Sequence, residues 1–283
     1  MILKKKLETI LFLGILSLAC AQEKGVESAE PVFYPPDTPV AENEAIVWYL
    51  GHCGFAVKTE NHFLIFDYEE THDESRLGRP ANPQLGNGYI NPNEIRDFNV
   101  SIFVTHSHMD HYDPVIFEWE GLIDNIGYFF GWKDVQTEKY NHMEGPRAEL
   151  KTDGLEIYTI NSHHSGVPEV AYLIKVDGLV LYHNGDCQAE YQEDYEFLKT
   201  KAENIDIAFV FCVYDPGLHY TIQNYELIEK FGPNALFPMH RIGEERTHLE
   251  EFKRVYNSAG FENPVIFCDR KGKSFFYKNG RIQ

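Results

Sequence analysis

The chain contains 283 residues, of which 24% are charged, and its formal net charge is −19 at pH 7. This length suffices to bury the core of one large α/β domain, and the composition is that of a globular protein. An acidic surface repels nucleic acid unless basic residues cluster locally, and Arg270, Lys271 and Lys273 are too few to form such a cluster. We therefore expect no nucleic-acid partner, while the oligomeric state stays open.

The N-terminus has the pattern of a secretory signal, with a basic start, an apolar run at residues 11–18 and small residues up to Ala21. Cleavage after Ala21 would leave a soluble protein, whereas cleavage before Cys20 would leave a cysteine for lipid attachment, although Ser17 stands where such signals typically carry Leu. We predict a signal peptide at residues 1–21 and export to the bacterial cell envelope, either as a periplasmic protein or as a lipoprotein that meets the membrane only through Cys20. The alternative is a membrane anchor or a buried helix.

Residues 22–43 are rich in Glu and Pro, so we predict an extended tether, followed by a catalytic domain at residues 44–283. Three short strands open this domain, at residues 45–50, 55–58 and 63–67. Residues 69–93 carry many Gly, Pro and Asn and should form a long loop over one face. The apolar run 100–105 is typical of a strand buried on both faces.

Asp177-Gly178 joins two apolar runs, 170–176 and 179–183, which is a strong signal for a β-hairpin. Pairing Val176 with Leu179 puts Glu169 opposite Asp186 at the open end. The other predicted elements are strands at 155–160, 205–213 and 235–238, helices at 191–201, 222–231 and 244–258, and a final β pair of 265–268 with 274–277.

The densest chemical signal is the sequence THSHMDH at residues 105–111, which places four metal-ligand side chains directly after a buried strand: His106, His108, Asp110 and His111. In extended backbone, residues two apart project to the same side, so the first two histidines can chelate one ion. A following turn can bring the other two side chains to a second ion. The pattern therefore predicts a metal site, against the alternative of a chance histidine-rich loop.

His164, Asp186 and His240 each lie a few residues beyond the end of a predicted strand. Active sites of sheet proteins often collect at such ends. His163 is chemically as suitable as His164, but adjacent residues in extended chain point in opposite directions. We expect His164 to reach the metal.

These segments, in their order along the chain, resemble the metallo-β-lactamase superfamily. THSHMDH resembles its His-x-His-x-Asp-His signature, and HNGD at residues 183–186 resembles its later Gly-Asp motif. FPMH at 237–240 resembles the terminal histidine motif of the branch that includes ascorbate-6-phosphate lactonase. YLGHCGF at 49–55 and LIFDY at 64–68 are similar to the opening strands of that branch.

The resemblance implies an α/β fold, the four-layer αββα sandwich of mixed sheets. It also implies two divalent metal ions as cofactors, zinc in the first place and manganese as the alternative. One ion would be bound by His106, His108 and His164, the other by Asp110, His111 and His240, and Asp186 would bridge the two.

Such a site implies a hydrolase acting on a small molecule. Paired cations lower the pKa of a bound water, and the resulting hydroxide can attack a small ester, lactone, amide or phosphoester. Asp110 and Asp186 are the candidates for steering the proton of the attacking water. His219 and Arg241 are weaker candidates for substrate contact, since an exposed histidine or a surface ion pair explains them as well. His52 is expected to support the site from outside the metal ligands.

Two other functions stay open. An iron-dependent oxidoreductase could use the same scaffold, but the diiron flavoproteins of the superfamily usually carry an acidic residue where His108 stands. A non-catalytic envelope protein could retain the metal site, although the presence of every ligand-type residue argues against decay.

Overall fold

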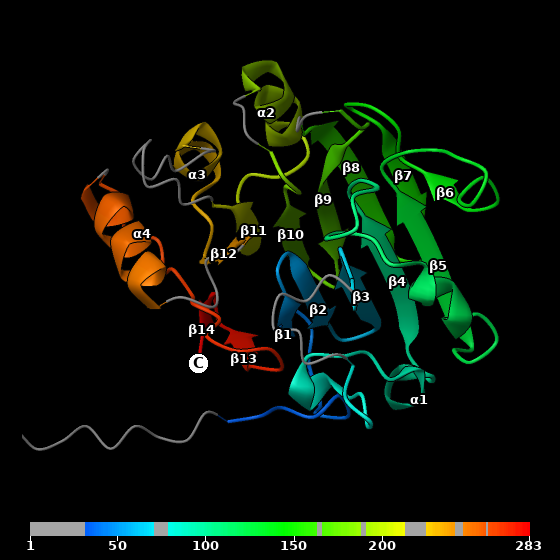
Figure 1. Cartoon of the computed structure of the whole chain (residues 1–283). Helices are drawn as coiled ribbons and strands as arrows, with labels where there is room; N and C mark the ends of the chain where they lie inside the picture. Colours follow the sequence, from blue (N-terminus) through cyan, green and yellow to red (C-terminus); the bar gives the residue numbers. More distant parts are fainter. Residues whose placement is uncertain are drawn as a thin grey trace, which may run out of the picture. The chain divides into compact units, whose positions relative to one another are not determined.

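Two β-sheets packed face to face carry the fold (Figure 1). The computed structural model describes residues 32–70, 79–162, 166–187, 191–212, 225–240, 246–258 and 260–283. The predicted signal peptide with Cys20, the start of the tether, and the residues His163, His164, His219 and Arg241 lie outside these ranges. The other candidate site residues are all described.

The first sheet has the strand order β14-β13-β1-β2-β3-β4-β5-β6. It is mixed, because β1, β2, β3, β13 and β14 pair antiparallel, whereas β3 to β6 run parallel. Its strands are β1 (Ala45–Gly51), β2 (Gly54–Lys58), β3 (His62–Phe66), β4 (Asn99–Val104), β5 (Asn125–Phe130), β6 (Asn141–His142), β13 (Ser274–Lys278) and β14 (Arg281–Ile282).

The second sheet has the order β12-β11-β10-β9-β8-β7 and is also mixed, with β10, β11 and β12 parallel. Its strands are β7 (Glu149–Thr152), β8 (Leu155–Asn161), β9 (Val170–Val176), β10 (Leu179–His183), β11 (Ile207–Phe211) and β12 (Ala235–Met239). Parallel strands end at the same edge of a sheet, so the residues that follow β10 and β12 emerge together.

Helices cover the outer face of the second sheet: α2 (Gln192–Lys199), α3 (Tyr225–Phe231) and α4 (Arg246–Ser258) share one buried cluster with its strands (Figure 1). The outer face of the first sheet is covered by short elements, which are α1 (Pro92–Ile95) and the 3-10 helices Leu85–Asn87 and Pro114–Trp119. The four-layer αββα sandwich that the motifs predicted is therefore confirmed.

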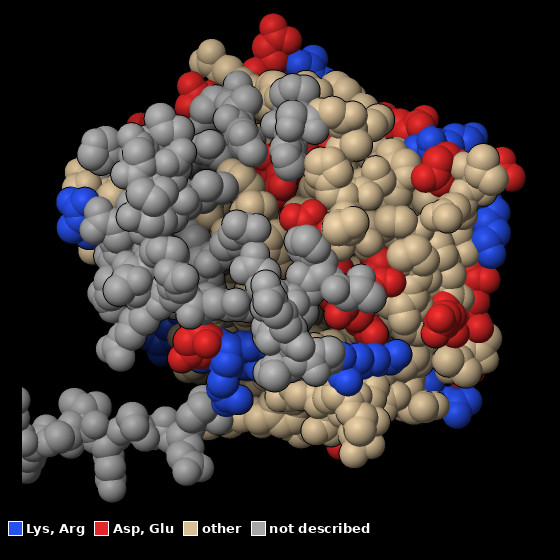
Figure 2. Space-filling model, viewed as in Figure 1, with Lys and Arg blue, Asp and Glu red and all other residues tan. Residues whose placement is uncertain are grey.

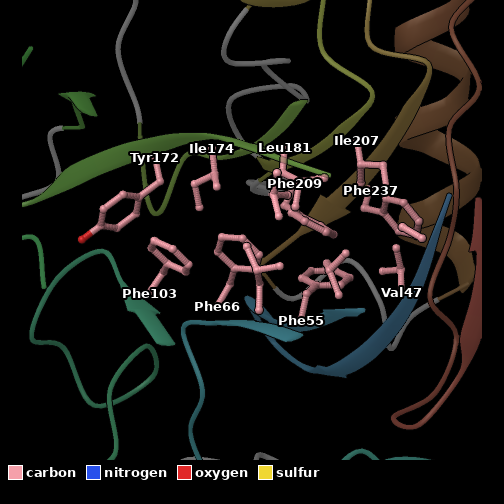
Figure 3. Close-up of a cluster of buried hydrophobic side chains, with 14 of the residues drawn as sticks. Val47, Phe55, Phe66, Phe103, Tyr172, Ile174, Leu181, Ile207, Phe209 and Phe237 are labelled. Carbon is pink, nitrogen blue, oxygen red and sulfur yellow. The ribbon is translucent and has the colours of Figure 1, made fainter. Parts of the chain in front are cut away.

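Aromatic side chains fill the space between the sheets (Figure 3). Phe55 of the first sheet stacks on Phe209 of the second with ring centroids 4.3 Å apart, and Phe103 meets Tyr172 at 5.4 Å. Full burial of one such side chain contributes about 1.5–3 kcal/mol. This core fixes the two sheets against each other and so fixes the strand ends that carry the polar cluster.

The predicted hairpin of β9 and β10 is confirmed, with Val176 paired to Leu179 and Tyr172 to His183. Asp177 and Gly178 both have positive φ, 46° and 82°, as a two-residue type I′ turn requires. Glu169 and Asp186, which the predicted register puts opposite each other, are in contact, because the Asp186 N–H donates to Glu169 Oε1 over 2.6 Å.

The predicted final β pair is wrong. Residues 265–268 do not form a strand with β13. Val265 instead makes a single parallel bridge to Leu236 of β12, and β13 pairs with β1 and β14. β5, whose sequence NIGYFF was not assigned to any element, continues the parallel part of the first sheet. Within the described part of the predicted tether, Tyr34 and Pro36 accept hydrogen bonds from Trp48 and Lys58 of this sheet.

Candidate metal centre

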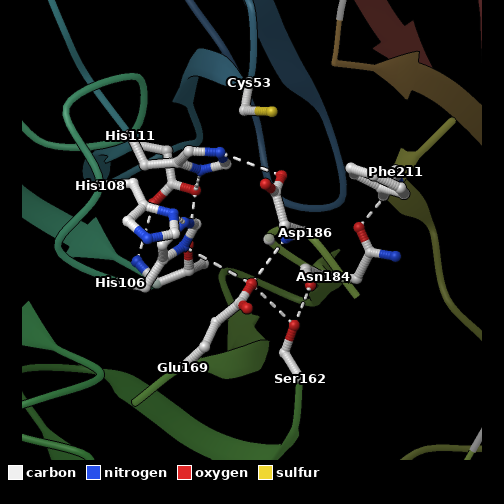
Figure 4. A network of polar contacts seen from close by, with 12 residues as sticks. Cys53, His106, His108, His111, Ser162, Glu169, Asn184, Asp186 and Phe211 are labelled. Carbon is white, nitrogen blue, oxygen red and sulfur yellow. Dashed lines mark hydrogen bonds and ion pairs between the residues drawn. The ribbon is translucent and has the colours of Figure 1, made fainter. Parts of the chain in front are cut away.

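The loop after β4 gathers the residues of the THSHMDH motif. His106 and His111 are fully buried, and His108 and Asp110 are half-buried. The His111 N–H donates to the His108 carbonyl over 3.0 Å, which closes the turn that the spacing predicted. His106 Nε2 lies 3.1 Å from His108 Nδ1, so the two imidazoles present a pair of nitrogens to the same place (Figure 4).

Asp186, three residues beyond β10, faces this loop from the second sheet (Figure 4). Its Oδ1 lies 3.0 Å from His111 Nε2, and its Oδ2 lies 3.5 Å from Nε2 of His240, the residue that follows β12. Asp110 Oδ2 lies 3.3 Å from His52 Nε2 in the turn between β1 and β2. The structure thus brings together all the predicted metal ligands that it describes, and it adds His52.

Asp67 is a site residue that motif spacing did not single out. Its buried carboxylate accepts the Thr105 N–H at 2.8 Å and the Thr105 hydroxyl at 2.7 Å, and it lies 2.7 Å from His111 Nδ1. Since a carboxylate only accepts, Nδ1 carries a proton. Burial alone would lower the pKa of His111, but its acidic neighbours raise it, so Nε2 must be without a proton before it can bind a metal. Asp67 directly follows β3, so the strand-end rule applied to the other ligands would have found it.

Glu169 supports the cluster from below (Figure 4). Its Oε1 accepts the Asp186 N–H at 2.6 Å and the Ser162 hydroxyl at 2.8 Å, and it lies 3.5 Å from His106 Nδ1. Burial raises the pKa of Glu169 to about 7. A Cβ at position 185 would lie 2.3 Å from this oxygen, so Gly185 is required for the carboxylate to fit.

Burial and mutual charge set the protonation of the cluster. Burial, together with the neighbouring His111, lowers the pKa of His106 to about 3, so this imidazole stays neutral, the form that binds metals. Burial alone would raise the pKa of Asp186, but its contacts with His111 and His240 hold it well below the usual range. Burial alone would also raise the pKa of Asp110, but its contacts with His52 and His111 lower the pKa, so this carboxylate stays ionised.

The cluster fits divalent metal ions. His52 Nε2, His111 Nε2 and His240 Nδ1 are buried and make no hydrogen bond, although buried polar atoms normally have a partner. Two groups offer ligand atoms within 4.8 Å of one another, namely His52, Asp110, His111 and His240, and Cys53, His111 and Asp186. Neutral imidazoles and ionised carboxylates are the donor set that zinc and manganese accept.

Comparison with known proteins identifies the family. The beta-lactamase superfamily domain matches residues 46–240, a span that includes every described cluster residue. A UPF0173 metal-dependent hydrolase from Salinibacter ruber is 24% identical over 235 residues, covering 77% of this chain and 95% of the relative. A second UPF0173 metal-dependent hydrolase, from Pyrococcus furiosus, is 25% identical over 210 residues, covering 69% of this chain and 83% of the relative. The chain belongs to the metallo-β-lactamase superfamily, as its motifs predicted, and is a metal-dependent hydrolase of that superfamily.

Solved structures show the same fold at low sequence identity. A metallo-hydrolase from Ignicoccus hospitalis has a TM-score of 0.57 with 20% identity, covering 83% of this chain and 99% of its own. CmlA, a diiron β-hydroxylase from Streptomyces venezuelae, has a TM-score of 0.56 with 11% identity, covering 85% of this chain and 55% of its own. The fold therefore occurs in both hydrolytic and oxidative enzymes, and it does not identify the substrate.

Proposed function

We propose that the chain cleaves a small ester, lactone, amide or phosphoester with two divalent metal ions, zinc in the first place and manganese as the alternative. The observation that carries this proposal is the cluster in which nitrogen and oxygen donors from four strand ends converge. The bound ions would supply Lewis acidity and lower the pKa of a bound water.

The proposed division of ligands is the one that the family resemblance implies. His106 and His108, which lie 3.1 Å apart, would hold the first ion with His164. Asp110, His111 and His240 would hold the second, with Asp186 between the two sites. Both acidic residues are anionic in the folded protein, so they can accept the proton of an attacking water. His219 and Arg241 remain candidates for substrate contact.

A small neutral or anionic molecule is the substrate we propose. On the face of the molecule in Figure 2, the Lys and Arg side chains that are shown lie in small groups among Asp and Glu, which supports the absence of a nucleic-acid partner. The similarity to CmlA supports an iron-dependent oxidoreductase as the second candidate. Metal analysis of protein purified without added metal separates the two.

We also propose export to the cell envelope, either as a periplasmic protein or as a lipoprotein whose lipid on Cys20 is its only membrane attachment. This rests on the basic start, the apolar run and the small residues of the N-terminus. Among the described residues, none of the helices has the length and apolar character needed to cross a membrane.

A panel of chromogenic esters, lactones, amides and phosphodiesters tests the proposed reaction. The metal-loaded chain should hydrolyse at least one class, and His108→Ala should reduce that turnover by ~100-fold or more because one ion loses a ligand. The matched control is His142→Gln in β6, where Nε2 bonds the Thr137 carbonyl outside the cluster. Oxygen consumption with iron-loaded protein, and no hydrolysis of the panel, would favour the oxidoreductase instead.

A further inference from the structure

We propose that His52 is a direct ligand of the second metal ion, together with Asp110, His111 and His240. This inference rests on the proposed function, since it concerns the same pair of ions. It departs from the sequence expectation that His52 only supports the site, and from the three-residue ligand set that the superfamily resemblance implies.

The distance between His52 and Asp110 is that of two ligands that share one ion. Bonds of ~2.1 Å at tetrahedral angles put two ligand atoms about 3.4 Å apart. His52 Nε2 lies 3.3 Å from Asp110 Oδ2, and one ligand atom from each of the four residues lies within 4.8 Å of the others. The His52 and His240 rings are adjacent, with centroids 4.5 Å apart.

Within the described residues, the polar contact of this nitrogen is with Asp110. His52 Nε2 is buried and lies 3.3 Å from Asp110 Oδ2, the distance of an ion pair. The His52 side chain is 13% exposed, so water does not surround it. A bound cation would satisfy this nitrogen and the Asp110 carboxylate at the same time.

The backbone around His52 is held in an uncommon conformation that keeps the ring at the cluster. His52 and His240 have φ values of 47° and 68°, a left-handed geometry that costs a non-glycine residue about 1–2 kcal/mol. The His240 N–H donates to the His52 carbonyl at 3.3 Å, and His183 Nε2 lies 2.9 Å from the Cys53 carbonyl. Two strands of the second sheet therefore anchor the turn of the first sheet that carries His52.

A further ligand changes the roles of the two ions. With Asp186 between the ions, three imidazoles and two carboxylates would surround the second ion and leave no position open, whereas catalytic sites keep one open. Water and substrate would then bind at the first ion, beside the half-buried His108. We expect the second ion to be the more tightly held of the two.

Cobalt binding to the full-length chain tests the proposal. Metal-free protein is titrated with Co²⁺, following the visible absorption bands and the bound metal per chain. His52→Gln keeps a side chain that can hydrogen-bond Asp110 but is a poor ligand. We expect this variant to bind the more tightly held Co²⁺ with an affinity lower by more than ~100-fold, and the absorption spectrum of that ion to change. Residues that only support a ligand typically lower metal affinity by ~10–100-fold. His142→Gln should titrate like the unsubstituted chain.

Unchanged affinity and spectrum in His52→Gln would overturn the proposal, because a hydrogen-bonding role is one that glutamine preserves. If the variant does not fold, a crystal structure of the cobalt-loaded, unsubstituted chain decides: an Nε2–metal distance of ~2.1 Å supports the proposal and one beyond ~3 Å refutes it. An unsubstituted chain that binds no cobalt at all contradicts the proposed function itself, which is a different result.

Discussion

Glu169 shows how one side chain can hold several residues of the candidate metal centre in place. Its Oε1 takes the Asp186 N–H and the Ser162 hydroxyl and lies 3.5 Å from His106, so it touches residues assigned to both ions. The sequence placed Glu169 opposite Asp186 through the hairpin register, but a register fixes backbone positions and not side-chain contacts. Its role became visible only from the packing.

Glu169→Ala should lower metal affinity by ~10–100-fold, because Asp186 and His106 lose the group that orients them. The variant should also lose about 1–3 kcal/mol of stability, since the buried Asp186 N–H loses its acceptor. Glu169→Gln keeps an acceptor oxygen and should recover most of the affinity. Competition with a chromogenic chelator measures this, with Glu156→Gln on the surface of β8 as the control. Equal affinity in the alanine and unsubstituted proteins would contradict the role.

His164, which lies outside the described residues, is expected to be the third histidine of the first ion. His164→Ala should lose one metal and nearly all activity. His163→Ala should keep both metals and lose ~10–100-fold in activity if it supports a ligand. Metal counts on the two variants decide, and full occupancy in His164→Ala with depletion in His163→Ala would show that the assignment is reversed.

At the scale of elements, the turn of the β9–β10 hairpin fastens the two sheets together at the end opposite the metal centre. Asp177 accepts the Thr59 hydroxyl at 2.6 Å and the Asn61 N–H at 2.8 Å, and it lies 3.0 Å from His62 Nδ1. These partners lie in and beside the β2–β3 turn. Burial alone would raise the pKa of Asp177, but these hydrogen bonds outweigh it and lower the pKa to about 2.

Asp177→Asn keeps a residue that tolerates the left-handed turn and removes only the charge. In metal-free protein near neutral pH, this substitution should lower the free energy of unfolding by about 1–3 kcal/mol. Because the folded pKa lies below the ordinary 3.8, the carboxylate stabilises fully above about pH 4, and this contribution is lost as the pH falls to about 2. Urea unfolding of both proteins across this range measures it. A stability difference that persisted undiminished at pH 2 would show that the charge is not responsible.

The strands also show which features a local sequence pattern can predict and which it cannot. The Asp177-Gly178 turn and the run of β4 could be predicted because each pattern is local. The run 265–268 is apolar in the same way, yet its neighbour is Leu236 of β12, because pairing between distant segments is decided by packing. The role of His52 is hidden from the sequence for a related reason: its own φ is positive, at 47°, which no spacing rule reveals.

In the whole molecule, the four-layer sandwich brings the candidate metal ligands of the described residues to one edge. The motif loop and the His52 turn come from the first sheet, and Asp186 and His240 come from the second. The site therefore exists only when the two sheets are packed. Ions that bind the folded state alone stabilise it, by about 2.7 kcal/mol at a free concentration one hundred times the Kd.

The cellular location of the protein is a separate prediction. The mature protein should begin at Cys20 or Gln22 and lie outside the cytoplasm, because a signal peptidase removes the basic and apolar start. Mass spectrometry of protein from its native cell measures this, and a lipid-sized mass on Cys20 distinguishes the two cleavages. An intact Met1 would refute export.

Metal content coupled to activity tests the central claim most directly. Elemental analysis of the purified chain should give close to two transition-metal ions per molecule. A strong chelator should abolish hydrolysis, and zinc or manganese should restore it, because the ligands belong to the folded protein and survive metal removal. A stoichiometry of zero, or hydrolysis indifferent to the chelator, would contradict the two-metal account.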